Sequence, residues 1–289
     1  MQREESRSRL GPMKLFRTRS GVLVEDAGLF HPVNLSWDDV FRADDPRRAI
    51  EAAMGAAGPS RAALDESELL PPIGHQEVWA AGVTYYRSRA ARMEESRAAG
   101  GGDFYALVYE AERPELFFKA SAHRVVGSGQ AVRIRRDARW NVPEAELVLA
   151  LSAAGRIFGY TVGNDMSSRD IEGENPLYLP QAKVYDGSCA LGPGLIVSSQ
   201  PLDKDTAISL RIGRRGQEVF QGETTLAQLR RTPASLVEYL YREASFPDGA
   251  FLMTGTGIIP PSEFTLQAGD EIRIDIAGVG RLINTVADR

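Results

Sequence analysis

Three acids in the middle of the chain have a spacing that could build a metal site. Glu144 and Glu146 stand on either side of an alanine at the start of the apolar run Ala145–Leu151, which alternates as a β-strand does. On a strand, side chains at i and i+2 share a face, so the two carboxylates would point the same way. Carboxylate oxygens held on rigid strands are ligands that a hard divalent cation such as Mg²⁺ prefers.

The elements around these acids predict a hairpin that brings Asp165 to the same place. Residues 152–156 have the composition of a turn, and residues 157–163 form a second strand-like run that leads into Asp165. Antiparallel pairing would return Asp165 to the neighbourhood of the two glutamates. A Glu-x-Glu pair on a strand usually belongs to a solvated face, so this pattern alone is weak evidence for a metal site. Only the residues that follow it strengthen that interpretation.

Composition bounds the size of the protein and its classes of partner. The chain has 289 residues, 43% of them hydrophobic, which is enough for one large or two unequal domains. A net charge of -5 does not favour nucleic acid or an anionic membrane as a partner, and no apolar run predicts a membrane span. The single cysteine, Cys189, excludes an internal disulfide and fits the cytoplasm. The charged start does not resemble a secretory signal, and either Met1 or Met13 could be the native start.

Local patterns before the acids predict a small first domain. Strand-like runs near residues 14–16, 22–25 and 29–33 are followed by helical patterns at residues 37–42 and 46–57. Pro71 and Pro72 then interrupt the chain. We therefore expect a small α/β domain over residues 1–70 and a second domain over residues 71–289.

The sequence of the second domain predicts mostly β-strands with short helices. After Asp165, serines able to cap a helical turn precede Glu172, and residues 176–180 are expected to form a loop before Lys183. Later strand-like runs alternate with glycine turns rather than with long helices, so a rolled or closed mixed sheet is expected. Residues 87–102 are charged and end in glycines, which fits either a mobile lid or a solvated surface helix.

Several stretches, in this order, resemble the fumarylacetoacetate hydrolase superfamily: PELFFKASAHRVVGSG, PEAELVLAL, GYTVGNDMSSRDIE, AKVYDGSCALGP and TGTG. The resemblance covers about residues 78–286. It implies an α+β, β-rich fold, with a mixed β-roll catalytic domain behind a small N-terminal α/β domain, assembled as a homodimer or higher homo-oligomer. It also implies a Mg²⁺ or Mn²⁺ ion held by Glu144, Glu146 and Asp165, with Lys183 as the active-site lysine and Thr256 as a loop residue that contacts the substrate.

One departure separates this chain from the hydrolases of that family. They carry a His and a Glu that activate water, and Ser88 and Ala91 stand at those positions here. Neither residue can serve unaided as a general base near neutral pH. The stretch GVTYYRSRAARMEES instead resembles the sugar-acid dehydratase branch, the 2-keto-3-deoxy-D-arabinonate (pentonate) dehydratases. Many hydrolases also carry Gln where this chain has Glu172. The carboxylate of Glu172 could move protons, or it could be a surface acid.

We therefore predict a metal-dependent lyase that dehydrates a small 2-keto-3-deoxy sugar acid to a dioxo acid. The metal would polarise the C2 ketone, and Glu172, the preferred base, or Lys183 if its pKa is depressed, would take a C3 proton. Ser88, Arg89 and Thr256 would hold hydroxyl and carboxylate groups, although Arg89 fits a helix surface equally well. Two alternatives stay open. One is a carbon–carbon hydrolase of the acylpyruvase type or a 2-oxo acid decarboxylase, and the other is a catalytically silent homologue that binds metal or oxo acids.

Overall fold

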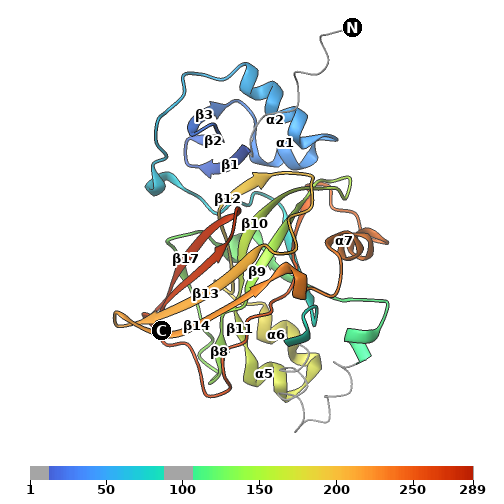
Figure 1. The fold of residues 1–289 in the computed structure, drawn as a ribbon, viewed down its shortest axis with the longest axis vertical. Helices are drawn as coiled ribbons and strands as arrows, with labels where there is room; N and C mark the ends of the chain where they lie inside the picture. Colours follow the sequence, from blue (N-terminus) through green and yellow to red (C-terminus); the bar gives the residue numbers. More distant parts are fainter. Residues whose placement is uncertain (1–12, 88–106, 289) are drawn as a thin grey trace.

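A small N-terminal unit stands on a larger β-rich unit in the computed structural model, which describes residues 13–87 and 107–288 (Figure 1). Local chemistry explains where the first helices begin, because Ser36 and Asp45 cap them by accepting hydrogen bonds from the backbone N–H groups of Asp39 and Arg48. The predicted strands and helices of this unit are present, namely β1 (Met13–Thr18), β2 (Gly21–Asp26), β3 (Leu29–Val33), α1 (Trp37–Arg42) and α2 (Pro46–Gly55).

The larger unit consists mainly of strands. In the first part these are β4 (Glu77–Gly82), β5 (Glu115–Ser121), β6 (Val125–Val126), β7 (Ala131–Val132), β8 (Asn141–Val142), β9 (Ala145–Leu151), β10 (Ile157–Asp165) and β11 (Ser167–Ser168). The later strands are β12 (Cys189–Val197), β13 (Ala207–Arg214), β14 (Gln217–Thr225), β15 (Ala250–Met253), β16 (Glu271–Ile276) and β17 (Gly280–Val286). The described helices are short: α5 (Arg169–Glu174), α6 (Leu179–Lys183) and α7 (Pro233–Tyr241).

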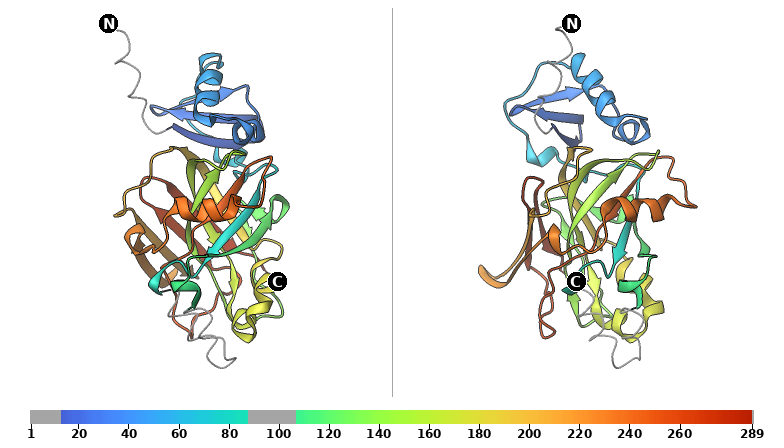
Figure 2. Two further views of the ribbon diagram at one scale, coloured as in Figure 1. Left: turned by 90° about the vertical axis from the view of Figure 1, so that its right-hand side faces the viewer. Right: turned by 45° about the vertical axis from the view of Figure 1, so that its right-hand side comes forward.

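The strands form two large mixed sheets. A ten-stranded sheet runs in the order β3-β2-β1-β12-β10-β9-β15-β4-β5, with β6 beside β12, and a five-stranded sheet runs β14-β13-β16-β17-β7. In Figure 2 the orange and red strands of the smaller sheet stand against the green strands of the larger one. This β-rich arrangement confirms the predicted fold class. None of the helices in the described ranges is long and apolar enough to cross a membrane.

Strand β9 lies between two hydrophobic cores, which explains its nearly continuous apolar sequence. Leu147 and Leu149 face the core shared with the second sheet, whereas Val148 and Ala150 face the core that also contains Phe41 of α1. All seven residues of β9 are buried. A strand covered on both faces carries apolar residues at successive positions rather than alternating ones. Glu146 lies on the same face as Val148, and this placement buries its carboxylate.

The N-terminal unit is joined to the larger sheet through backbone pairing. Strand β1 pairs antiparallel with β12, with Met13 opposite Val197, so β1, β2 and β3 extend the ten-stranded sheet. An ion pair between Arg42 and Asp248, 2.6 Å apart, adds a contact between the units. The division into residues 1–70 and 71–289 stays a prediction, because the sheet continues across the boundary.

One predicted loop is helical in the structure, so that prediction was wrong. Residues Pro176–Tyr178 form a 3₁₀ turn, and α6 follows directly. Pro176 and Pro180 lie in the first turns of these helices, where the backbone N–H that proline lacks would have no helical partner. As a result, Lys183 sits at the end of a helix rather than on an irregular segment.

Candidate active site

The β9–β10 hairpin brings the three predicted acids together. Glu144 directly precedes β9, Glu146 pairs with Gly163 across the hairpin, and the backbone N–H of Asp165 donates to the carbonyl of Glu144 at 3.0 Å. Each acid offers a carboxylate oxygen, and these oxygens lie within 4.8 Å of one another. The three residues are at most 5% exposed. The predicted convergence of the acids from two paired strands is therefore present.

Lys183 joins this cluster from the end of α6. Its ammonium group donates to Glu144 Oε2 at 2.9 Å, to Asp165 Oδ2 at 3.0 Å and to Ser167 Oγ at 2.6 Å. The lysine is 1% exposed, so these hydrogen bonds form away from bulk water. A buried ammonium needs such partners, because leaving it unpaired would be very costly.

A second buried lysine, Lys119, was not predicted as a site residue. It ends the aromatic part of β5, and its Nζ lies 2.5 Å from Asp165 Oδ1. The same ammonium donates to the backbone carbonyls of Met166 at 3.0 Å and Lys183 at 2.5 Å. Lys119 therefore links the end of β10 to the end of α6. The only sequence signal was a lysine at the end of an apolar strand, inside one of the motifs that carried the resemblance.

Arg169 is a further site residue that sequence reasoning missed. It opens α5, is 2% exposed and donates from Nη2 to Glu144 Oε1 at 2.7 Å. Its Nε lies 3.8 Å from Glu172 Oε2 on the same helix. Glu172 is 1% exposed, which excludes its interpretation as a surface acid. Among the described residues Arg169 lines the cavity beside the acids, whereas Glu172 does not.

The electrostatics of the cluster fit a divalent cation. Burial raises the pKa of Glu146 well above its ordinary value, and the neighbouring charges of Asp165 and Glu144 raise it further. Lys183 and a hydrogen bond from the backbone N–H of Gly255, at 2.6 Å, act in the opposite direction. A hard cation would relieve the repulsion among the three carboxylates, whose oxygens are the ligands that Mg²⁺ and Mn²⁺ prefer.

The turn after β15 completes the wall of the site. Gly255 has a φ of +91°, which favours glycine, and this conformation aims its N–H at Glu146. A Cβ at Gly255 would lie only 2.0 Å from Thr84 Oγ1, so this position has no room for a side chain. Thr256 follows directly, is 4% exposed and lines the same cavity as the acids. Its predicted contact with substrate stays a prediction.

The space between the acids is small. The cavity lined by Glu144, Glu146 and Asp165 measures about 10 Å³, which is about the room of one water molecule. A second hollow of about 320 Å³ begins at Gly257, next to Thr256. Its wall includes Tyr85, Arg87, Glu223, Thr224 and Thr225, all of which carry polar groups.

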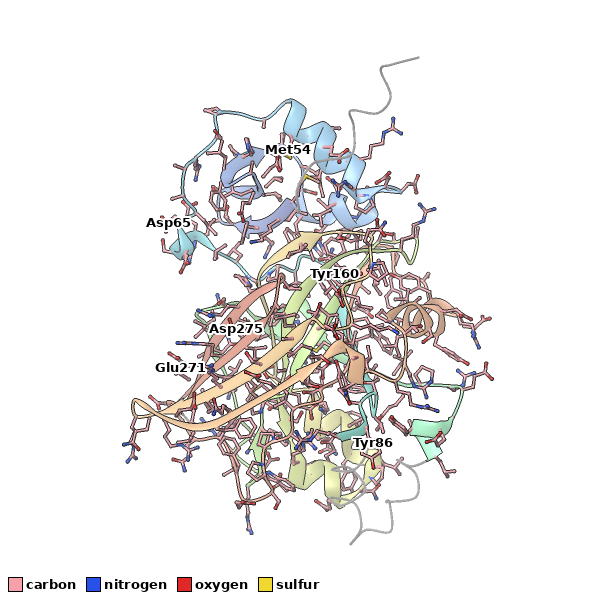
Figure 3. The ribbon with its side chains drawn as sticks, in the orientation of Figure 1. Met54, Asp65, Tyr86, Tyr160, Glu271 and Asp275 are labelled. Atoms are coloured by element: carbon pink, nitrogen blue, oxygen red, sulfur yellow. The ribbon has the colours of Figure 1, made fainter. Side chains whose placement is uncertain are left out.

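Two predicted substrate-binding residues, Ser88 and Arg89, lie outside the described residues. So does the predicted lid at residues 87–102, except for its first residue. The preceding residue, Tyr86, which is labelled in Figure 3, is 62% exposed.

Comparison with known proteins identifies the family. A protein of Haloferax volcanii named probable 2-keto-3-deoxyxylonate dehydratase is 46% identical over 248 residues, which cover 86% of this chain and 84% of that protein. The 2-dehydro-3-deoxy-D-arabinonate dehydratase of Saccharolobus solfataricus is 41% identical over 230 residues, covering 78% of this chain and 76% of that protein. The solved structure of 2-keto-3-deoxy-D-arabinonate dehydratase complexed with magnesium and 2,5-dioxopentanoate superposes with a TM-score of 0.81 at 31% identity, covering 96% of this chain and 99% of that chain.

The family model described as fumarylacetoacetate (FAA) hydrolase C-terminal matches residues 84–287. This range contains the three acids, both buried lysines, Arg169 and Thr256. The chain therefore belongs to the fumarylacetoacetate hydrolase family.

Proposed function

We propose that this protein is a divalent-metal-dependent dehydratase that converts a 2-keto-3-deoxy sugar acid to a dioxo acid such as 2,5-dioxopentanoate. The observation that carries this proposal is the buried cluster of Glu144, Glu146 and Asp165. The cluster occurs in a chain that is 46% and 41% identical to two proteins named as dehydratases of such acids. The related structure with magnesium and 2,5-dioxopentanoate supports both the cofactor and the product class.

The charges at the site suit a metal ion together with a monoanionic substrate. Four acidic and three basic side chains are buried here: Glu144, Glu146, Asp165, Glu172, Lys119, Arg169 and Lys183. If all are ionised, they leave one net negative charge, and a divalent cation would change this to one net positive charge. A 2-oxo acid carries a single carboxylate, which would neutralise the site. When bound, the metal supplies Lewis-acid stabilisation of negative charge at the 2-oxo group, which acidifies the C3 protons.

The residues of the chain would bind the substrate and move its protons. Lys183 lines the cavity, so it can reach a bound substrate directly, but its ammonium group would have to give up a proton before it could take the C3 proton. Glu172 is the second candidate, because it is buried beside Arg169 but is not among the described residues that line the cavity. Arg169 would then orient the substrate carboxylate or a hydroxyl group. Thr256 would contact the substrate from the opposite wall.

The proposed reaction balances without an external oxidant or reductant. A proton leaves C3, the C4–oxygen bond breaks, and the C4 hydroxyl takes up a proton and leaves as water. The resulting C3–C4 double bond is conjugated with the 2-oxo group. In a five-carbon acid, tautomerisation then moves hydrogen from the C5 alcohol to C3 and C4 and leaves an aldehyde at C5.

The polar hollow next to Thr256 supports a substrate with hydroxyl groups. The cavity between the acids is too small for a sugar acid, whereas the adjoining hollow measures about 320 Å³. The 2-oxo acid end would lie at the metal, and the hydroxylated end would extend past Thr256 toward Arg87 and Glu223.

A hydrolase is the less favoured alternative. The chain has three histidines, and none of them lines the cavity beside the acids. Ser88 and Ala91 occupy the sequence positions where the hydrolases of the family carry their water-activating pair. General base catalysis typically contributes about 10²–10⁴-fold, so a site without it would cleave carbon–carbon bonds slowly.

Assembly and location stay predictions of the sequence. We expect a homodimer or higher homo-oligomer in the cytoplasm, with no nucleic acid or membrane partner. Sedimentation velocity and cell fractionation would check these two expectations.

The proposal is tested by incubating the purified chain and Mg²⁺ with 2-keto-3-deoxy-D-arabinonate, a six-carbon 2-keto-3-deoxy acid or an acylpyruvate, followed by mass spectrometry. We expect a product lighter than the sugar acid by one water and dependent on Mg²⁺. The Glu146→Gln variant is the matched control and should form none of it. Rapid cleavage of the acylpyruvate to pyruvate, with no dehydration of either sugar acid, would overturn the proposal in favour of a hydrolase.

A further inference from the structure

A third cavity, larger than the two described above, is lined by Leu147 and lies on the face of β9 opposite to that of Glu146. It measures about 490 Å³ and is bounded by β9, β10 and the two segments 199–204 and 226–234. It shares no lining residue with the cavity at the acids. Strand β10 connects the two places, since Asp165 ends the strand whereas Tyr160 lines the third cavity. Tyr160 and Asp165 are five positions apart, which is about 16 Å along a strand.

The interior of this cavity is apolar. The side chains of Leu147 and Tyr160 are buried. Ile157 and the other leucines of the wall are half-buried, whereas Pro201 and Ala234 are exposed. Small-molecule sites commonly measure about 300–1,000 Å³ and have mostly hydrophobic walls with a few polar groups. This cavity fits that description, with an apolar wall made of Leu147, Ile157, Tyr160, Leu202, Leu226 and Leu229.

The polar part of the cavity wall is positively charged. Lys204, Arg230 and Arg231 contribute to it, and no acidic residue does. Arg230 pairs with Glu110 at 2.9 Å. Arg231 donates instead to backbone carbonyls, including that of Ala111 at 2.7 Å, and in residues 13–87 and 107–288 neither it nor Lys204 has an ion pair with a carboxylate. Among the described residues, neither charge is therefore paired with a carboxylate, although backbone carbonyls of residues 108–113 hold the guanidinium group of Arg231.

We infer that this cavity is a binding site for an amphipathic carboxylate, a small acid with a compact hydrophobic body. The leucine-lined interior would take up the hydrophobic body. The carboxylate would lie at the rim beside Lys204 and Arg231, where it gains favourable charge interactions. Burying the apolar body supplies the affinity, at about 25 cal/mol for each Å² removed from water. A sugar acid does not fit this description, because it has no hydrophobic body. The occupant thus differs in class from the proposed substrate.

Calorimetric titration of the full-length chain with 1-naphthylacetate, a compact aromatic carboxylate, tests this inference. The neutral 1-naphthylacetamide is the matched ligand control. We expect saturable binding of the acid and at least about tenfold weaker binding of the amide. The Glu146→Gln variant should bind 1-naphthylacetate as the wild type does, since it changes only the cluster of acids. Loss of binding in that variant would place the acid at the metal site and overturn the inference.

Two cavity variants and two surface controls make the assignment specific. Leu202→Trp should fill the cavity and weaken binding more than about tenfold, and Lys204→Glu should weaken it about five- to tenfold. Leu177→Trp, at an exposed position, and Lys14→Glu, at a half-buried position, both lie outside the cavity and should bind within about twofold of the wild type. If Leu202→Trp does not fold, unchanged affinity in Lys204→Glu alone overturns the inference.

Two further outcomes would also overturn it. One is the absence of binding by the wild type at millimolar 1-naphthylacetate. The other is a sedimentation result in which Lys204→Glu dissociates an oligomer while the acid fails to bind. In that case a second copy of the chain covers the cavity.

Discussion

The ammonium group of Lys119 lies 2.5 Å from Asp165 Oδ1, and both side chains are almost completely buried. The other oxygen of Asp165 accepts a hydrogen bond from Lys183 at 3.0 Å. Both oxygens of this proposed metal ligand are therefore held by lysines that come from different elements, β5 and α6. Residues that orient a ligand in this way commonly affect metal affinity almost as strongly as the ligand itself.

Lys119→Met should lower the affinity for Mn²⁺ or Mg²⁺ about 10–100-fold, because Asp165 loses the partner that orients it. The variant should also unfold at lower temperature, since the carbonyls of Met166 and Lys183 lose a buried donor. Calorimetric metal titration and thermal unfolding measure the two effects. Lys14→Met, at a surface lysine, is the control. Unchanged metal affinity in Lys119→Met would argue against this role.

Glu146→Gln should abolish metal binding and turnover without destabilising the fold. Burial and the adjacent acids raise the pKa of Glu146, so the metal-free protein already favours the neutral carboxyl group that glutamine imitates. Thermal unfolding in EDTA should give the same or a slightly higher midpoint than the wild type. Electron paramagnetic resonance with Mn²⁺ would detect lost binding, and retained tight binding would contradict the three-carboxylate site.

Gly255→Ala should reduce turnover strongly. The new methyl group would meet Thr84 Oγ1 at 2.0 Å, and the positive φ adds backbone strain of about 1–3 kcal/mol. The turn must then shift, which removes the hydrogen bond to Glu146 and displaces Thr256. Gly269→Ala is the control, because its φ is also positive but open space surrounds it. If both variants lose turnover equally, backbone strain rather than the position of the turn explains the effect.

Lys183 and Glu172 can be distinguished by their effects on proton exchange. If Lys183 takes the C3 proton, Lys183→Met should remove both dehydration and the exchange of C3 protons with deuterium oxide. Glu172→Gln should then keep exchange and lose about 10–100-fold in turnover, because it disturbs Arg169 rather than the proton acceptor. Nuclear magnetic resonance of a bound 2-oxo acid would follow the exchange. Loss of exchange in Glu172→Gln, with metal binding intact, would assign the proton transfer to Glu172.

Asp38 should stabilise the contact between the two units in a pH-dependent way. Burial acts to raise the pKa of Asp38, but hydrogen bonds from His75 and Gln76 outweigh it and hold the pKa below 3.8. A pKa lowered by folding contributes stability that is complete above the ordinary value and is lost as pH falls through the folded value.

Asp38→Ala should therefore lower the free energy of unfolding by about 1–2 kcal/mol at pH 7. The difference from the wild type should shrink below pH 3.8. Urea unfolding at several pH values measures it, with Asp39→Ala as the control. If the difference in unfolding free energy between the wild type and Asp38→Ala stayed constant down to the lowest pH, the ionised carboxylate of Asp38 would be excluded as its source.

The sequence was sufficient to locate the acids and the hairpin that carries them. Glu144 and Glu146 lie at i and i+2 of an apolar run, and strand period alone places such side chains on one face. The predicted hairpin then pointed to Asp165, the resemblance to the family pointed to Lys183 and Thr256, and the structure places all three at the same cavity. These inferences rest on local patterns and on motif order, both of which can be read along the chain.

Only the tertiary structure decided which other charged residues belong to the site. Lys119 lies in the second half of strand β5 and Arg169 opens a helix, and in the sequence both positions are compatible with a solvated surface. They are buried because β5, α5 and α6 pack around the end of the β9–β10 hairpin, and burial then requires each charge to find a partner among the acids. The large apolar cavity also joins segments that are distant in the chain. Such convergence depends on how whole elements pack against each other. Neither the hydrophobic periodicity of a segment nor the propensities of its residues can predict it.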